Sequence, residues 1–309
     1  MITSRITTFA VAVGFLVMAG LVPAKGKGGG GGAGAGEYAK GNQLFEAKQY
    51  DQAIAAFSKA IAADGKQPTY YENRGFTFLA LGKGLEASTD FSKAIELAPK
   101  DERAYIGHVQ ALLLQRDYEN ALTDAGKAIE INPNNADAYR FRGFAEVGLS
   151  QWDKAVADFT TAIQKKPEDM QNYDRRAWAN RNLKNYDPAI ADYNLMIEKD
   201  PANPEPLVKR GATYVSMMQY EKAISDYEAA LKFKPDDYDT VQRLQYARAM
   251  LAAKNAPPPT PIPTQSESHV FTLLNIMIAL AVLIVIAVVV RVVTRGKPEE
   301  PPSTSSRIR

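Results

Sequence analysis

Apolar residues along the chain follow the spacing of amphipathic helices, and the pattern repeats. The segment TDFSKAIELAP, residues 89–99, is typical of the second half of such a helix, stopped by a proline. Near-copies return in steps of 34 residues, at 55–65, 123–133, 157–167, 191–201 and 225–235. Unrelated helical hairpins would not keep one register through six copies, so the pattern predicts an all-α chain of six helix pairs.

Each copy carries the same order of large and small residues. The small residues of the first helix are Gly41, Gly75, Gly143, Ala177 and Gly211, and the later rings are Phe57, Phe91, Phe159, Tyr193 and Tyr227. The closing prolines are Pro99, Pro133, Pro167, Pro201 and Pro235. Small residues let two helices approach, rings fill the remaining space, and proline ends the second helix. Val109, Gly84, Ala125 and Met196 depart from their columns.

These columns and their period resemble the tetratricopeptide repeat. The repeat-like region runs from 37 to 254, because DDYDTVQRLQYARAMLAAK after Pro235 resembles a C-terminal capping helix. The resemblance implies a solenoid of six 34-residue helix pairs. It also implies a concave groove, lined by the first helices, that binds peptides or partner helices.

The segments before the repeats are typical of a secreted protein. Residues 1–24 combine Arg5, an apolar run from Phe9 to Leu21 and small residues up to Ala24, which predicts a signal peptide cleaved after Ala24; an uncleaved anchor is the alternative. Residues 25–36, KGKGGGGGAGAG, are expected to form a flexible linker. The chain has no cysteine, so no disulfide or thiolate chemistry is expected.

The segments after the repeats predict a membrane anchor. Residues 255–269 are a proline-rich linker, and Val270 to Val290 form 21 residues without a charge, which predicts one transmembrane helix. Arg291 and further cations follow in the short basic tail, residues 291–309, which is expected to be disordered. Positive charge favours the cytoplasmic side, so we expect a single-pass protein with extracytoplasmic repeats, on the periplasmic side of a bacterial inner membrane.

Charge and residue types argue against nucleic acid and catalysis. Residues 37–254 hold 29 basic and 32 acidic side chains, a net charge of −3 that offers no basic face for phosphates. His108 and His269 are the only histidines and lie in different segments, so no catalytic or metal-ligating pair is predicted, and no cofactor is expected. The acidic residues Asp90, Asp124, Asp158, Asp192 and Asp226 recur at one repeat position, which indicates architecture. An enzyme is the weakest hypothesis.

Two groups of residues are candidates for peptide binding. One groove type in this family holds a C-terminal carboxylate with two asparagines and basic residues. Carried over position by position, Asn42 and Asn73 match the asparagines and Arg103 matches a basic position, while Tyr38 and Gly107 replace the other cations. Coincidence is the alternative, because short motif matches have a high false-positive rate.

The second candidate group combines cations and aromatic rings on the groove side of the first helices. It consists of Arg140, Phe144, Arg175, Trp178, Arg181 and Lys209. Such a set can bind acidic or aromatic peptide segments, and the alternative is that the rings pack internally while the arginines are solvated. The sequence thus favours a membrane-anchored scaffold that binds partner proteins. An assembly, export or chaperone-like factor that holds client chains is the runner-up, and an enzyme subunit is third.

Overall fold

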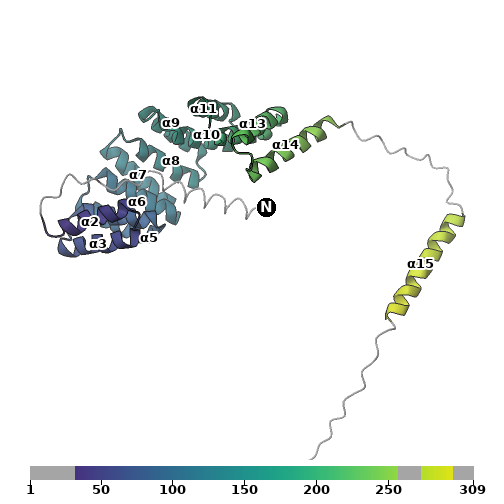
Figure 1. Ribbon diagram of the computed structural model, residues 1–309, viewed down its shortest axis with the longest axis horizontal. Coiled ribbons are helices and arrows are strands. Elements are labelled where there is room, and N and C mark those ends of the chain that lie inside the picture. The colour runs from purple at the N-terminus through teal and green to yellow at the C-terminus, as the bar shows by residue number, and fades with distance from the viewer. Residues whose placement is uncertain (1–31, 257–272, 295–309) are drawn as a thin grey trace, which may run out of the picture. The chain divides into compact units, whose positions relative to one another are not determined.

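The computed structural model describes residues 32–256 and 273–294 (Figure 1). It divides into two units, residues 1–254 and 255–309, and every regular element in the described ranges is an α-helix. The predicted signal peptide, most of the glycine linker, most of the proline linker and the tail after residue 294 lie outside the described residues.

Six helix pairs and a capping helix make up the first unit. The pairs are α2 (Ala35–Glu46) with α3 (Tyr50–Ala63), α4 (Pro68–Ala80) with α5 (Gly84–Leu97), α6 (Glu102–Gln115) with α7 (Tyr118–Ile131), α8 (Ala136–Gly148) with α9 (Trp152–Lys165), α10 (Met170–Asn182) with α11 (Tyr186–Lys199), and α12 (Pro204–Ser216) with α13 (Tyr220–Phe233). The capping helix is α14 (Tyr238–Asn255). The predicted helical solenoid is confirmed, and we number its pairs one to six.

Local sequence sets where the helices begin and end. The side chains of Asp101, Asn135, Asp169 and Asn203 each accept a bond from a backbone N–H in the first turn of the following helix. Within every pair the chain turns through a residue with positive φ: Lys48, Gly82, Arg116, Ser150, Lys184 and Met218. Five of these six are not glycine, so the hydrogen bonds of the surrounding turn hold them in the left-handed region.

The small residues and the rings of the repeat pack directly on each other within a pair. A Cβ added at Gly41, Gly143 or Gly211 would lie 2.5–2.8 Å from an atom of Phe57, Phe159 or Tyr227, respectively. Each ring lies 16 residues after its small partner and is at most 1% exposed. The close helix approach predicted from the columns therefore exists, and any larger side chain at these glycines would collide with the ring.

In pair three the small position holds a larger residue and the ring position holds a small one. Val109 stands at the small position and Ala125 at the ring position, both are fully buried, and both belong to one apolar cluster. The larger valine thus accompanies the loss of the ring. Gly107, also in α6, takes over the small role, because its added Cβ would lie 2.2 Å from Phe91 of pair two.

Gly84 is compensated in the same way across neighbouring pairs. Where Tyr118 carries the ring, the residue 30 positions later is Gly148, whose added Cβ would lie 2.4 Å from that ring. Where Gly84 lacks a ring, the residue 30 positions later is Leu114, at 3.2 Å from an added Cβ. The exceptions Val109, Ala125 and Gly84 are thus each accompanied by an opposite change in size at the contacting position.

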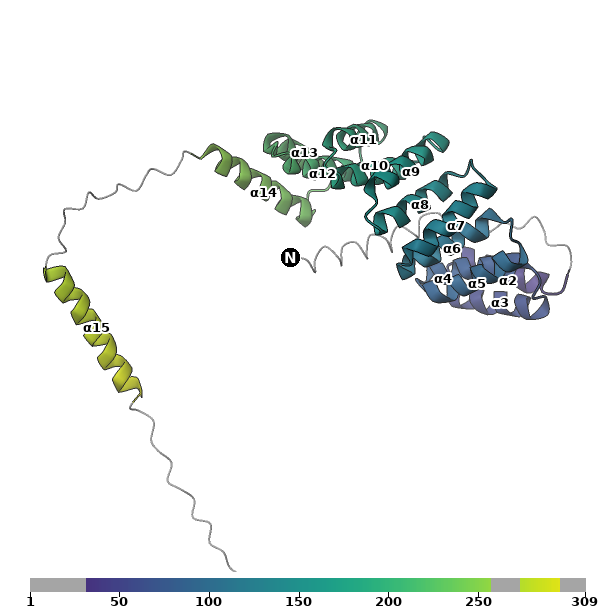
Figure 2. The ribbon, with the colours of Figure 1, turned by 180° about the vertical axis from the view of Figure 1, so that it is seen from behind.

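The first helices lie on the inner side of the stack. α4 contacts both α2 and α6, and α6 contacts α8, whereas the second helices of these pairs show no comparable contact with one another. Consecutive pairs follow one another along the array (Figures 1 and 2). The face of the first helices is therefore the concave one, as the family resemblance implies.

The second unit contains α15 (Leu273–Thr294). Its described apolar side chains, from Met277 to Val290, are half or more exposed. No helix among the residues that the structure describes is long and apolar enough to cross a membrane. The transmembrane assignment of residues 270–290 stays a prediction.

Candidate functional site

The repeated aspartates of the second helices bind cations of the first helices. In four pairs an arginine of the first helix donates two hydrogen bonds of 2.6–3.0 Å to the aspartate 16 residues later. These arginines are Arg74, Arg142, Arg176 and Arg210. We call this set, with His108–Asp124, the ion-pair ladder. The architectural interpretation of the aspartates is thereby supported, and a column of arginines 16 positions upstream could have revealed their partners.

Most ladder arginines also reach back to the preceding pair. Nη1 of Arg74 donates to Ser58, that of Arg176 to Thr160 and that of Arg210 to Asn194, at 2.6–3.3 Å. The equivalent partner of Arg142 is Gly126, which has no side chain. The Arg142 side chain is correspondingly more exposed, at 31% against 21–23% for the other three.

His108 replaces an arginine in the ladder. Its Nδ1 lies 2.5 Å from Asp124, and its Nε2 lies 2.8 Å from the hydroxyl of Ser88. Serine, histidine and carboxylate in this order are typical of hydrolases, which also need donors for an oxyanion. Ser88 lies inside α5, whose backbone N–H groups are used by the helix, and His108 stands where the other pairs have arginine. We therefore assign this contact to packing between helix pairs.

The first candidate group does come together on the concave side of pairs one to three. Nδ2 of Asn73 donates to Asn42 at 2.7 Å and to Tyr38 at 3.0 Å, and Arg103 Nη2 lies 3.4 Å from the Asn73 carbonyl oxygen. Asn73 is fully buried. Its side chain is therefore engaged in bonds within the protein.

A carboxylate of the protein itself occupies this group. Glu72 is 1% exposed and accepts a bond from Arg103 at 3.2 Å. Burial, followed by the charge of Asp101, raises the pKa of Glu72 to about 7, although Arg103 opposes the rise. Phe91 fills the space beside Gly107, so a cation has no room there. An internal carboxylate and an aromatic ring thus stand where a peptide carboxylate and an arginine would be needed.

In the second group, Arg140 and Phe144 are buried parts of the fold. Arg140 is 6% exposed and pairs with Asp137 at 2.6 Å and Asp169 at 3.1 Å. Phe144 is 8% exposed and packs edge-on against Phe159. Phe144 therefore packs internally, as the alternative interpretation states. Arg140 is not solvated, as that interpretation expects, but forms buried ion pairs.

The remaining members lie partly open on α10 and α12. Arg175, Trp178 and Arg181 are spaced by three residues on one face of α10 and are all half-buried. Trp178 lies edge-on to Trp152. Lys209 and Arg175 both pair with Asp174, at 2.7 and 3.3 Å. The Nε atoms of Arg175 and Arg181 are buried and have no hydrogen-bond acceptor.

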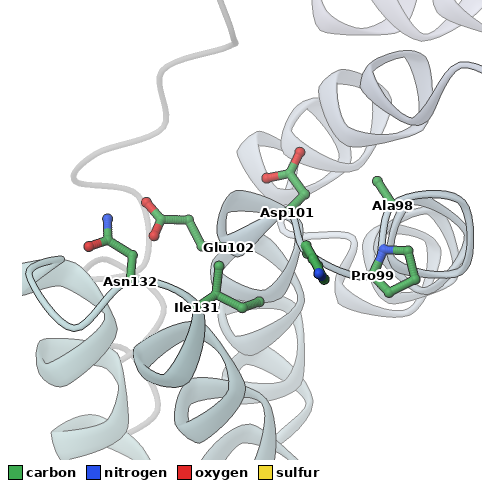
Figure 3. Close-up of a pocket in the computed structure, with 7 residues that line it drawn as sticks. Ala98, Pro99, Asp101, Glu102, Ile131 and Asn132 are labelled. Carbon is green, nitrogen blue, oxygen red and sulfur yellow. The ribbon is translucent and has the colours of Figure 1, made fainter.

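A separate cavity of about 750 Å³ lies at the connection between α5 and α6 (Figure 3). Pro99, Asp101, Glu102, Ile131 and Asn132 line it. None of the candidate residues reaches it, and among the described residues no cluster of three or more acidic, histidine or cysteine side chains could hold a metal ion. The cavity therefore adds no chemistry to the groove.

The acidic residues that pair with these cations were not predicted from the sequence. Glu72 and Asp174 occupy groove-side positions and neutralise Arg103, Arg175 and Lys209. The only signal in the sequence was a carboxylate next to a predicted groove residue, as in Glu72–Asn73 and Asp174–Arg175.

Helix pairs stacked with small-to-ring contacts and a concave face of first helices define a repeat scaffold. Sequence profiles described as TPR repeat or tetratricopeptide repeat match residues 41–82, 74–136, 142–204 and 204–237, together more than half of the chain. The chain belongs to the tetratricopeptide repeat family.

Curated relatives share only a short part of their length with this chain. It is 40% identical over 73 residues to "Protein STIP1 homolog" of Dictyostelium discoideum, covering 24% of this chain and 13% of the relative. It is 36% identical over 77 residues to "Mitochondrial import receptor subunit TOM70" of Rattus norvegicus, covering 23% and 13%. It is 31% identical over 83 residues to "Hsp70-Hsp90 organizing protein" of Triticum aestivum, covering 27% and 14%.

Solved structures share the fold. YrrB, described as a TPR protein with an unusual peptide-binding site, superposes with a TM-score of 0.52 at 23% identity, covering 63% of this chain and 98% of YrrB. A tetratricopeptide repeat protein from Parabacteroides merdae superposes with a TM-score of 0.54 at 19% identity, covering 77% and 92%. At these identities the likeness concerns the fold alone.

Proposed function

We propose that this protein is a membrane-anchored adaptor whose repeat domain binds partner proteins on its concave face, at pairs four to six. The observation that carries this proposal is the pair of buried guanidinium Nε groups on α10, in Arg175 and Arg181, that have no acceptor. A buried donor without a partner costs about 1–3 kcal/mol, and an acceptor from a bound segment would recover it.

Neighbouring groups on α10 suit such a segment. Trp178 offers a half-buried ring between the two arginines, and aromatic and arginine side chains dominate the energetics of protein interfaces. Burial lowers the pKa of Arg175, and the charge of Arg140 adds to this, whereas Asp174 opposes it. A further acceptor would therefore stabilise the buried charge. In contrast, Glu72 and Phe91 already fill the group around Asn42, Asn73 and Arg103, so we place binding at pairs four to six.

The anchor in this proposal is the segment 270–290. As a helix of about 1.5 Å per residue, its 21 uncharged residues extend over about 31 Å, close to the roughly 30 Å core of a bilayer. The exposed apolar side chains of α15 are consistent with lipid contact. Arg291 and the cations after it favour a cytoplasmic C-terminus and extracytoplasmic repeats.

Photo-crosslinking tests the face that binds. A photoreactive amino acid replaces Trp178 on the concave side or, as the matched control, Lys93 on α5, a second helix. Crosslinks to one defined partner from position 178 but not from 93 would support the adaptor. Crosslinks from position 93 alone would exclude concave binding, and a spread of unfolded client chains from 178 would favour the chaperone-like alternative.

Protease accessibility tests the orientation. Protease added to intact spheroplasts should digest the repeats and spare the residues after Arg291. If the repeats are protected until the membrane is lysed, the proposed orientation is wrong.

A further inference from the structure

The junction between pairs five and six departs from a packing pattern that the other junctions keep. One position near the end of each second helix holds an alanine that is at most 2% exposed in five pairs: Ala60, Ala94, Ala128, Ala162 and Ala230. In pair five this position holds Met196 of α11, which is half-buried. Ala60 shares an apolar cluster with Tyr70 of α4, which lies ten residues later in the next pair. The 34-residue period therefore places Met196 beside Pro206 of α12, the equivalent of Tyr70.

None of the clusters of buried apolar residues among the described residues crosses this junction. At every other junction a cluster includes residues from both sides: Ala60 with Tyr70, Phe91 with Ala111, Ala125 with Phe141, Phe159 with Ala179, and Tyr227 with Leu244 of α14. The cluster around Tyr193 stays within pair five, and Met196 packs against it. Among the six pairs, the contact of α11 with α12 is also the least extensive between a second helix and the next first helix. Methionine is larger and more flexible than alanine, so it separates the two helices without fixing their distance.

An ion pair on the groove side bridges this junction instead. Asp174 of α10 pairs with Lys209 of α12 at 2.7 Å. Asp174 also pairs with Arg175 of its own helix at 3.3 Å. Lys209 also pairs with Glu205 of its own helix at 2.9 Å. Separation of α10 from α12 would therefore leave neither charge without a partner.

We infer that this junction is a hinge between two bodies, pairs one to five and pair six with α14. The Asp174–Lys209 ion pair is the latch that holds α10 and α12 together, and the bond from Arg210 to Asn194 joins α12 to α11 and serves as the pivot. Separation of two pairs exposes an apolar cluster to water wherever one crosses the junction, whereas a partly exposed ion pair exchanges partners at small cost. The array therefore opens most readily between pairs five and six. Opening would widen access to Arg175, and this use of the hinge rests on the proposed function.

Distances between paired spin labels test the hinge on the full chain in detergent. The chain has no cysteine, so two introduced cysteines carry the labels without background. Labels at the exposed residues Gln164 and Lys232 span pair five and include the proposed hinge. Labels at the exposed residues Glu130 and Glu198 occupy the same repeat positions one pair earlier and exclude it. The distance distribution from 164 to 232 should be at least about twice as broad as that from 130 to 198.

Two variants distinguish the role of the methionine from that of the latch. Met196→Ala restores the alanine of the other pairs, so it should keep the fold and narrow the 164–232 distribution to the width of the 130–198 distribution. Lys209→Gln removes the latch and should broaden the 164–232 distribution further. Lys93→Gln removes an exposed ion pair with Glu96 within α5, so it is the matched control and should leave the distribution unchanged.

The label distances are measured without a partner, so the hinge and the adaptor function are tested separately. Equal widths for the two label pairs in the wild type would overturn the hinge, as would an unchanged 164–232 distribution in Met196→Ala. An unchanged distribution in Lys209→Gln would show that Asp174–Lys209 is not the latch. Partner crosslinking from position 178 should fall several-fold in Met196→Ala, and an unchanged yield would overturn the role of the hinge in binding. If the hinge moves but the wild type crosslinks no partner from position 178, only the adaptor function is wrong.

Discussion

Pairs three and four differ from pair five in what holds them together. Pairs three and four share one apolar cluster that includes Leu113, Phe141 and Phe159. The cluster of pair five contains only three buried residues, Ala177, Ala189 and Tyr193, with Met196 packed against them. The contact of α11 with α12 is also the least extensive between consecutive pairs.

Pair five nevertheless keeps the geometry of the repeat. Its ladder pair, Arg176 with Asp192, has bonds of 2.6 and 3.0 Å, against 2.6–2.9 Å in the other arginine pairs. The sequence of α10, MQNYDRRAWANRN, is mostly polar and leaves its groove side to Arg175, Trp178 and Arg181. The difference teaches that polar contacts maintain the repeat where the apolar core is thin, and that this thin region is where the proposed binding groups lie.

The largest expected effect comes from removing a ring in the apolar region. Phe159→Ala should lower the free energy of unfolding by about 3–5 kcal/mol, because the fully buried ring leaves a cavity. Met196→Ala should change it by less than about 1 kcal/mol, since Met196 is half-buried and the same column has alanine in the other pairs. Denaturant unfolding measures both. Similar losses for the two variants would show that pair five has a core as important as that of pair four.

An exchange in pair three tests the compensation between Val109 and Ala125. Ala125→Phe alone should cost about 1–3 kcal/mol through overpacking. Val109→Gly alone should cost a similar amount, through a cavity and the flexibility of glycine. The double variant restores the glycine and the ring of the other pairs. Its loss of unfolding free energy should therefore be smaller than the sum of the two single losses by more than about 1 kcal/mol. Strict additivity in thermal or denaturant melts would mean that the two residues do not compensate.

Glu146 should make stability depend on pH. Burial, followed by the charge of Asp158, raises the pKa of Glu146 to about 7, so the folded state holds a proton that the unfolded state has released. The resulting stability is fully present below the ordinary carboxyl pKa of about 4.3 and is lost as pH rises through about 7. The free energy of unfolding of Glu146→Gln should therefore exceed that of the wild type by about 1 kcal/mol at pH 8 and match it near pH 4.

Melts from pH 4 to 8 measure this difference, with the exposed Glu119→Gln as the control. The pKa of Glu72 is raised as well, so the unfolding free energy of the Glu146 variant should still fall somewhat as pH rises. If the stability of the wild type and of Glu146→Gln changed equally with pH, the prediction would be contradicted.

The smallest expected effect is a gain. An added Cβ at Gly126 of α7 meets nothing within 4 Å, so Gly126→Ala should stabilise the protein by about 0.5–1 kcal/mol. Gly126→Ser should also supply the missing acceptor for Arg142 and lose its advantage over alanine when Arg142 is changed to Gln. Gly148→Ala is the opposite control, because its Cβ would lie 2.4 Å from Tyr118 and should destabilise. A melting temperature of Gly126→Ala below that of the wild type would show that position 126 has no room for a Cβ.

The sequence predicted the elements and the close contacts well, because a 34-residue period turns each column into one structural role. It could not predict the compensation of Val109 by Ala125 or of Gly84 by Leu114, since each exception makes sense only with its contact partner. It also gave no sign of the left-handed turns at Lys48, Arg116 and their equivalents, because no single residue type marks them.

The candidate site was predicted only in part. Asn42, Asn73 and Arg103 do meet, but Glu72 pairs with Arg103, which depends on side-chain packing rather than on spacing. The binding roles of the second group stay predictions.

The ion-pair ladder also bears on how the array would respond to mechanical force. Arg74, Arg176 and Arg210 each bind the second helix of their own pair and that of the preceding pair, so neighbouring pairs are linked one after another. Under tension applied at the end of α14, these bonds between neighbouring pairs would break one after another. The helix pairs should therefore detach one at a time. Each detached pair of 34 residues would release about 110–120 Å of extended chain. The junction at Arg142 lacks this backward bond and would instead rely on the apolar cluster that pairs three and four share.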